Sequence, residues 1–276
     1  MGAISSASPV TERDVRSVRS FLIRGLLAGL LAGLFAFAVA YVVGEPSINA
    51  AIALEESAAH THPEGTPAEH SHDEAAETEV PRSLQATAGL LTATAVTGTT
   101  LGGVIGVLSA LALGRFGRLS PRLSTLLVTG IGFVSVYAVP FWVYPPNPPA
   151  VGDPDTIGTR TVLYFTLVAI SLVAAVAAVL VGRRMAARWG AWYAGLAAVG
   201  GYLVVMLVAA GLLPGFNEVP VDFPATVLYE FRTASFVTQF TLWAVLGVVL
   251  AELVHRLVRR SRGAEAENPE LAGLPG

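Results

Sequence analysis

The sequence contains no cysteine and no lysine, because all seventeen of its basic residues are arginines. Without cysteine the chain forms neither a disulfide framework nor a thiolate metal site. Without lysine it has no P-loop lysine and no amine for Schiff-base chemistry, which excludes ATP hydrolysis of the P-loop type. Charged residues make up only 13% of the chain, and the arginines are spread along it. Nucleic-acid binding, which needs a gathered basic patch, is therefore disfavoured.

What the sequence does contain is six long apolar runs, which fit its hydrophobic content of 53% in 276 residues. A helix of about 20 apolar residues crosses the ~30 Å hydrocarbon core, where the backbone has to satisfy its own hydrogen bonds. The sequence therefore predicts an all-α, polytopic integral membrane protein with six transmembrane helices. The first run also resembles a secretory signal ending at Ala38-Val39-Ala40, but its length favours a retained span. The predicted spans are 21–43, 86–113, 123–143, 161–181, 191–213 and 233–253.

The arginines alternate between the connections of these spans. Fourteen of the seventeen lie before the first span or in its first turn, after the last span, or in the second and fourth connections, whereas fourteen of the twenty acids lie in the other three connections. Because arginine near span ends stays on the cytoplasmic side, both termini are predicted to be cytoplasmic, in the plasma membrane. Residues 1–20 form a cytoplasmic segment, 21–260 the membrane domain and 261–276 a cytoplasmic tail.

Residues 44–85 form the only long connection, predicted to be an external loop rich in histidine and acids. Four of the five histidines occur there as two His-x-His pairs flanked by carboxylates. Imidazole nitrogens and carboxylate oxygens suit Co²⁺, Ni²⁺, Zn²⁺ or Cu²⁺. The alternative is a solvated acidic loop in which the histidines have no metal role. The candidate ligands are His60, His62, Glu69, His70, His72 and Asp73.

Each of the three outer connections contains an acid followed at once, or one residue later, by proline. This pattern is typical of a helix start, with a carboxylate near the positive end of the dipole. Three duplicated helical hairpins would explain the pattern, but the simpler interpretation is that Pro, Asp and Thr gather in outer loops as turn formers. Repeats often place a site on their shared axis. The polar side chains that would form such an external vestibule are Glu45, Asn147, Asp153, Asn217 and Asp222.

Glycines recur at every fourth residue in the first two spans. Small residues at this spacing let two helix backbones approach closely in lipid. The pattern predicts a tight contact inside the first hairpin or with a partner helix, and a functional kink is the alternative. The glycines are Gly25, Gly29, Gly33, Gly98, Gly102 and Gly106.

Ionisable residues inside the spans are scarce, and one pair at helical spacing is Glu252 and His255. A charge in the membrane is by default a functional hypothesis. The simpler interpretation is an ion pair between Glu252 and Arg256 at the (i, i+4) spacing.

Several of these segments together resemble the CbtA family of probable cobalt transporter subunits. They are Gly44-Glu45-Pro46 with the Ala-rich segment that follows it, the His/acid loop, Val139-Pro140-Phe141, the Asn-Pro-Pro-Ala-Val-Gly-Asp-Pro stretch at 147–154, and 156–161. The resemblance covers nearly the whole chain. It implies uptake of cobalt alongside a small one-span partner that carries a His motif.

The predicted function is therefore that of a membrane subunit in the uptake of a divalent transition metal, with Co²⁺, or Ni²⁺ or Zn²⁺, as cargo and no tightly bound cofactor. The alternative is a structural or partner-binding membrane subunit that does not transport. An enzyme is not expected, since no Ser/His, Cys/His or intramembrane carboxylate pair is present. Membrane lipid is the expected surrounding, and the oligomeric state is left open.

Overall fold

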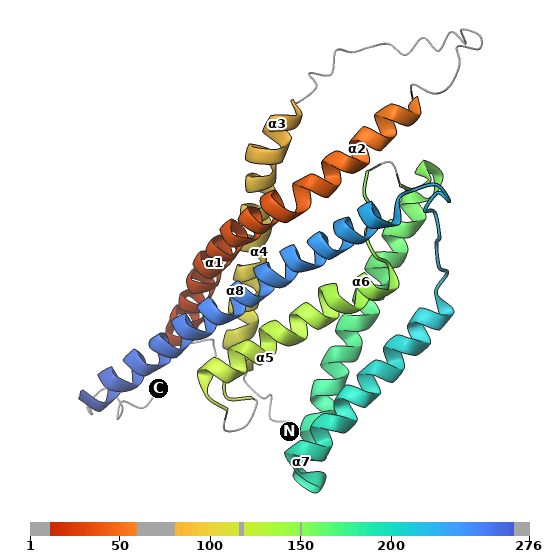
Figure 1. Ribbon diagram of the computed structural model, residues 1–276. Helices are drawn as coiled ribbons and strands as arrows, with labels where there is room; N and C mark the ends of the chain where they lie inside the picture. Colours follow the sequence, from red (N-terminus) through yellow and green to blue (C-terminus); the bar gives the residue numbers. More distant parts are fainter. Residues whose placement is uncertain (1–11, 60–80, 116–118, 150, 268–276) are drawn as a thin grey trace, which may run out of the picture. The chain divides into compact units, whose positions relative to one another are not determined.

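The computed structural model describes residues 12–59, 81–115, 119–149 and 151–267, and within these ranges it is helical and contains no strand. Figure 1 shows the helices in chain order. Their bounds are α1 Glu12–Val39, η1 Ala40–Gly44, α2 Glu45–Ala59, α3 Arg82–Leu84, η2 Gln85–Gly89, α4 Leu90–Ala112, α5 Pro121–Phe133, η3 Val134–Ala138, α6 Val139–Val143, η4 Pro154–Thr156, α7 Ile157–Leu212 and α8 Ala225–Glu267.

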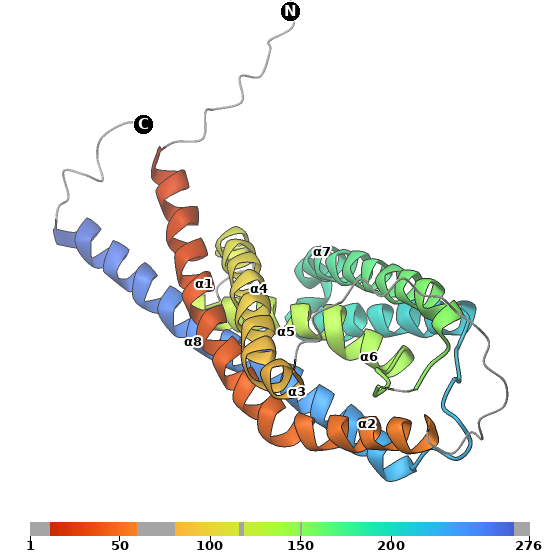
Figure 2. The ribbon, with the colours of Figure 1, turned by 90° about the horizontal axis from the view of Figure 1, so that it is seen from above.

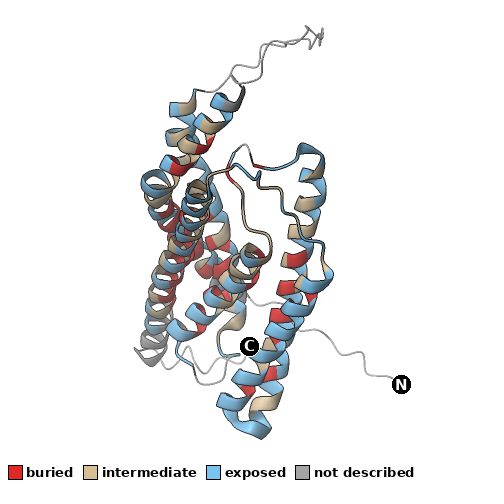
Figure 3. Ribbon diagram, turned by 45° about the vertical axis from the view of Figure 1, so that its right-hand side comes forward, coloured by how far each residue is buried: buried red, intermediate tan, exposed pale blue. Residues whose placement is uncertain are grey.

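Five helices in the described part of the chain are long and apolar enough to cross a membrane, so an all-helical membrane protein is confirmed. Their surfaces suit lipid, since the buried residues form narrow stripes between broad exposed faces (Figure 3). The candidate spans are Val18–Ser57, Arg82–Ala112, Pro121–Val143, Pro154–Leu212 and Ala225–Arg260. The predicted count of six is not reproduced by length and composition, because α7 joins the fourth and fifth predicted spans.

Helix α7 is bent back on itself. Its 56 residues would measure about 84 Å as one straight helix, far more than a bilayer core of ~30 Å. At Gly190 the backbone leaves the helix with φ 76° and ψ 160°, a conformation that is essentially restricted to glycine. Figure 1 shows the two arms running antiparallel from this turn. Between the arms the hydroxyls of Ser171 and Tyr202 form a hydrogen bond of 2.7 Å.

The chain folds as two compact units. The first contains the described residues up to Gly33, Ala95–Gly130, and the described residues from Trp243 on. The second contains Leu34–Thr94 and Ile131–Leu242. Helices α1, α4, α5 and α8 each contribute residues to both units.

In the first unit α1 and α4 touch through their glycines, and both views show the two helices side by side (Figures 1 and 2). A Cβ at Gly29 would overlap the backbone of Gly98, and a Cβ at Gly102 would lie 2.7 Å from the Cα of Gly29. The same holds at Gly106, where a Cβ would lie 2.6 Å from the carbonyl oxygen of Phe21. Only glycine permits this approach, which places backbone against backbone.

The second unit contains an aromatic cluster that joins η3 and the helices beside it to α8. Phe133 meets Phe236 and Phe240 edge-on, with ring centroids 6.1 and 5.8 Å apart. Tyr137 donates a hydrogen bond of 3.1 Å to the carbonyl oxygen of Ser235. Edge-to-face aromatic pairs add to the energy of burial, so this cluster holds the end of α5 and the turn η3 against α8.

The prediction that helices begin at the acid-proline pairs is right in two of three places. Asp153 caps η4 by accepting a hydrogen bond of 2.9 Å from Asp155 N, and α8 begins directly after Pro224. At Glu45-Pro46 the prediction is wrong, because α1, η1 and α2 are continuous. The π-helical turn of η1 ends two residues before Pro46 and absorbs the missing N–H and the ring's clash with the preceding turn. The turn η3 stands in the same relation to Pro140.

Candidate functional site

A cavity of about 370 Å³ opens at the π-helical turn of η1. Its walls come from η1 and α2, from η3 and from α8, all within the second unit. We call it the Glu45 cavity. Its polar lining consists of Glu45, Tyr137, Pro146, Ser235, Thr238 and Gln239. The cavity is mostly apolar and presents one carboxylate with a few hydroxyl and amide groups. It lies at a kind of helical irregularity that is frequent at functional sites.

Glu45 is buried, with 8% of its surface exposed, and it forms an ion pair with Arg82 of α3. The Arg82 side chain is 36% exposed, so the pair lies at the border of the cavity. Removing the arginine would leave Glu45 buried without its partner, which is costly for a charged group. The pair joins the two elements that flank the His/acid segment, since that segment leaves from α2 and returns at α3.

A second cavity, also of about 370 Å³, lies where α6 ends and α7 begins. We call it the Arg232 cavity. Its polar lining includes Asn147, Arg160, Tyr164, Asn217, Glu218 and Arg232. Pro146 lines both cavities. The two cavities are thus neighbours in the second unit that differ in charge.

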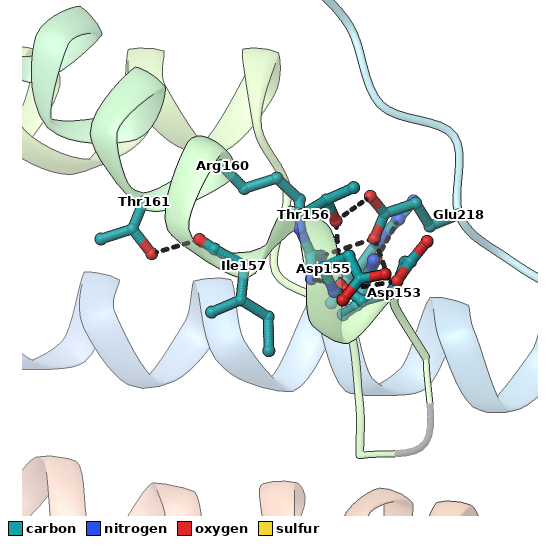
Figure 4. Close-up of polar contacts among 9 residues, drawn as sticks. Asp153, Asp155, Thr156, Ile157, Arg160, Thr161 and Glu218 are labelled. Atoms are coloured by element: carbon teal, nitrogen blue, oxygen red, sulfur yellow. Dashed lines mark hydrogen bonds and ion pairs between the residues drawn. The ribbon is translucent and has the colours of Figure 1, made fainter.

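Glu218 is fully engaged by the start of α7 (Figure 4). It accepts hydrogen bonds from the Thr156 hydroxyl and from Asp153 N, the latter at 3.0 Å, and pairs with Arg160 at 3.0 Å. The Thr156 hydroxyl above all, then the Asp153 N–H and the Arg160 guanidinium, hold the pKa of Glu218 below its usual value. The contacts tie the connection after the second arm of α7 to the first turn of the first arm.

Arg232 bonds to neutral oxygens. Its Nη2 donates to Asn147 Oδ1 at 2.9 Å, and its Nε donates to the carbonyl oxygen of Pro146 at 3.3 Å. Among the residues that the structure describes, no carboxylate forms an ion pair with it. The guanidinium therefore fixes the proline-rich connection after α6 and keeps its charge uncompensated.

The vestibule residues predicted from the sequence are placed in different surroundings. Glu45 lines the first cavity, Asn147 and Asn217 line the second, and Asp153 caps a helix. Asp222 lies in the turn before α8 and lines neither cavity. All five belong to the second unit, but they do not converge on one point.

The predicted metal ligands, His60 to Asp73, lie outside the described residues. Within the described ranges, no group of three or more His, Cys, Asp or Glu side chains is arranged to hold a metal ion. The described part of the chain therefore provides cavities with a few polar side chains but without a chelating cluster.

Sequence reasoning missed the roles of Arg82, Glu218 and Arg232. The signal was present, since Arg82 and Arg232 are two of only three arginines in the outer connections. An arginine on the side of the membrane where arginine is otherwise scarce indicates that a nearby group binds its side chain. The partner itself depends on contacts between segments that are far apart in sequence.

At the other end of α8, Glu252 forms two ion pairs, with Arg256 at 2.8 Å and with Arg122 at 2.7 Å. The (i, i+4) pair expected from the spacing is therefore present, and a cross-helix pair adds to it. His255 Nδ1 is buried and has no hydrogen-bond partner among the described residues.

Comparison with known proteins identifies the family. Neither the curated proteins nor the solved structures contain a match to the chain. The family model described as "Probable cobalt transporter subunit (CbtA)" matches residues 18–255, which include all five candidate spans apart from the last five residues of Ala225–Arg260. The description as a subunit implies a partner, and a transporter family indicates a protein that is not an enzyme. The chain is a membrane protein that belongs to the CbtA family of probable cobalt transporter subunits.

Proposed function

We propose that this protein is the membrane subunit of a divalent transition-metal uptake system, with Co²⁺ as its first cargo and Ni²⁺ or Zn²⁺ as competitors. The external His/acid segment collects the ion, and the Glu45 cavity receives it. The observation that supports this most directly is the position of Glu45, a buried carboxylate that lines a cavity at the start of α2 and pairs with Arg82 of α3, the two helices that flank that segment.

Chain length allows the transfer from the segment to the cavity. The ten residues from His72 to Arg82 span at most about 35 Å, and Arg82 contacts Glu45. Imidazoles select a transition metal, whereas one carboxylate with neutral oxygens binds it weakly. Weak binding suits a transit position, because the ion has to leave again. The cation would displace Arg82 from Glu45, which the partly exposed arginine permits.

Uptake by cells tests the collecting role. Cells with and without this chain are compared for uptake of radiolabelled Co²⁺ in competition with Ni²⁺ and Zn²⁺. Deletion of residues 60–73 is expected to raise the half-saturating Co²⁺ concentration while the amount of protein in the membrane stays the same. Unchanged uptake at limiting Co²⁺ removes the segment from the mechanism.

A matched pair of variants tests the cavity. Glu45→Gln keeps the size of the side chain and removes its charge, and we expect it to lower Co²⁺ uptake by about tenfold, the effect of losing one charged contact. Glu55→Gln is the control, since Glu55 is exposed on the same helix α2. Equal uptake by both variants excludes Glu45 from the ion path.

The proposal includes six crossings with both termini in the cytoplasm and the plasma membrane as location. The turn at Gly190 and the pairing of the arms support two separate crossings by α7. Since the chain lacks cysteine, labelling of one introduced cysteine shows on which side of the membrane that position lies. Ser71→Cys is expected to react with a membrane-impermeant maleimide in intact cells, and Ala187→Cys only after permeabilisation. The opposite result reverses the topology and removes the collecting role of the external segment.

Duplication of three hairpins stays a prediction. What supports it is the recurrence of a π-helical turn two residues before a proline, at η1 with Pro46 and at η3 with Pro140. The third outer connection lacks this feature.

The rival function is that of a structural subunit that binds a partner, such as a one-span protein with a His motif, and does not transport. Proteoliposomes that contain the purified chain alone separate the two. Uptake of Co²⁺ against an empty-liposome control supports transport by this chain. Uptake that appears only when a partner is added assigns translocation to the complex.

A further inference from the structure

The Arg232 cavity retains one positive charge. Its charged side chains are Arg160, Arg232 and Glu218. Glu218 is 3.0 Å from Arg160 and is also bonded to Thr156 and Asp153, so its oxygens are occupied. Arg232 is left with amide and carbonyl oxygens. Because a partly buried charge is stabilised by an opposite charge, the cavity favours an anion over a metal cation.

The donors in the cavity suit an oxyanion. A guanidinium has five N–H groups in a planar fork, and Arg232 uses two of them in the described contacts. The Asn217 amide and the Tyr164 hydroxyl also line the cavity, and neither forms a hydrogen bond to a described residue. Such a set can surround phosphate oxygens with a charge-assisted contact and two neutral ones.

The rim of the cavity is apolar and open. Ile157 and Phe165 line it and are 55% and 64% exposed. The cavity also lies where one candidate span ends, at Val143, and close to where the next begins, at Pro154, which is the depth of the lipid headgroups. A cationic pocket beside exposed apolar side chains matches a ligand that carries an anionic head and a hydrocarbon tail.

From these three features we infer that the Arg232 cavity binds the phosphodiester headgroup of an anionic membrane phospholipid, with the acyl chains against Ile157 and Phe165. The uncompensated charge favours a headgroup of net charge −1, such as phosphatidylglycerol. Phosphatidylcholine has the same phosphodiester, but its ammonium group would meet the arginine. Bound lipid would fix the proline-rich connection to α7 and α8, independently of any metal.

The test uses the purified full-length protein in detergent with equal amounts of phosphatidylglycerol and phosphatidylcholine, and native mass spectrometry counts the lipids retained. The wild type is expected to retain phosphatidylglycerol about tenfold over phosphatidylcholine. Arg232→Gln is expected to lose that preference by about tenfold, the effect of one charge-assisted contact. Arg188→Gln, which makes the same change at an exposed arginine, is expected to keep it. Equal retention by the two variants overturns the inference.

A second variant covers the case in which Arg232→Gln does not fold. Tyr164→Phe removes a hydroxyl without a described hydrogen-bond partner, and it is expected to fold and to lower phosphatidylglycerol retention by about threefold, the effect of one neutral hydrogen bond. Retention at the wild-type level contradicts the inference. Displacement of phosphatidylglycerol by millimolar inorganic phosphate would show that the cavity prefers free phosphate, and this result also contradicts the inference.

A third source of the anion is an acidic segment of a partner protein. In that case the wild type retains neither lipid preferentially, and Arg232→Gln weakens only co-purification with the partner, which overturns the lipid assignment. The readout is lipid retention, so it stays informative even if Co²⁺ uptake proves to be absent.

Discussion

The α1/α4 pair and the two arms of α7 are both membrane helices packed through small residues, but they are held together differently. Along α1 and α4 the glycine backbones touch, so no side chain separates the helices. Along α7 the arms border an open groove of about 650 Å³ that is lined mainly by Ala and Val. They are joined by the turn at Gly190, by the Ser171–Tyr202 hydrogen bond and by the contacts of Glu218 with the first turn.

The difference shows that small residues alone do not produce close packing in lipid. The α1/α4 contact is continuous because its glycines repeat at every fourth residue on both helices. In α7 the glycines of the second arm, such as Gly195 and Gly201, have no neighbouring atoms within 4 Å of the position that a Cβ would occupy. The arms of α7 are held by a small buried apolar cluster that includes Leu167 and Met206, and by a few polar contacts that can each be removed singly.

The largest effect is expected from Gly102→Ala. The added methyl group would lie 2.7 Å from the Cα of Gly29, and a backbone atom cannot move aside cheaply. We expect a loss of about 3 kcal/mol in unfolding free energy, or failure to fold, measured by thermal unfolding in detergent. Gly201→Ala is the matched change in α7, where nothing lies within 4 Å, and it should cost nothing. If both variants unfold alike, the α1/α4 contact is not as close as described.

Gly190→Ala is expected to come second. Alanine rarely adopts φ 76° and ψ 160°, so the turn between the arms would be strained by about 1–3 kcal/mol. The measurement is again the unfolding temperature, with helical Gly195→Ala as the control. A wild-type unfolding temperature for Gly190→Ala would mean that the turn does not hold the arms in place.

Tyr202→Phe removes the hydroxyl that bonds to Ser171, which is fully buried. Hydrogen bonds between membrane helices contribute about 0.6 kcal/mol on average, and an unpaired buried hydroxyl adds to the loss. We expect a decrease of about 1 kcal/mol in unfolding free energy in the same assay. Tyr193→Phe, at an exposed position of the same arm, should leave the unfolding temperature unchanged. An equal decrease in both would assign the effect to something other than this bond.

The smallest effect concerns pH. The pKa of Glu218 is lowered in the folded protein, so the carboxylate contributes stability above the usual glutamate value near 4.5, and this contribution fades as the pH falls through the lowered value. Glu218→Gln should therefore be less stable than the wild type at neutral pH, with the difference shrinking below about pH 4.5. Glu230→Gln, at an exposed carboxylate without a described ion pair, should show no such trend. A constant difference across pH contradicts a role for the ionised carboxylate.

Much of the fold follows from local sequence. The apolar runs of span length predict helices, because a backbone in hydrocarbon has to bond to itself. The repeated glycines mark the face on which α1 and α4 meet. The start at Asp153 could be predicted from the acid-proline pair, but Pro46 could not be distinguished from it, since a π-helical turn upstream leaves no signature in the sequence.

The candidate site was harder to predict from the sequence than the fold. Sequence alone determined the chemistry that is available, namely the four clustered histidines, the few outer arginines and the carboxylates, and it also predicted the membrane helices of the chain. The tertiary structure decided the partners, placing Glu45 against Arg82, 37 positions later, and Arg160 against Glu218. It also left Arg232 without a carboxylate among the described residues. Ion pairing depends on distances of a few ångströms between remote segments, and hydropathy and charge counts contain no information about such distances.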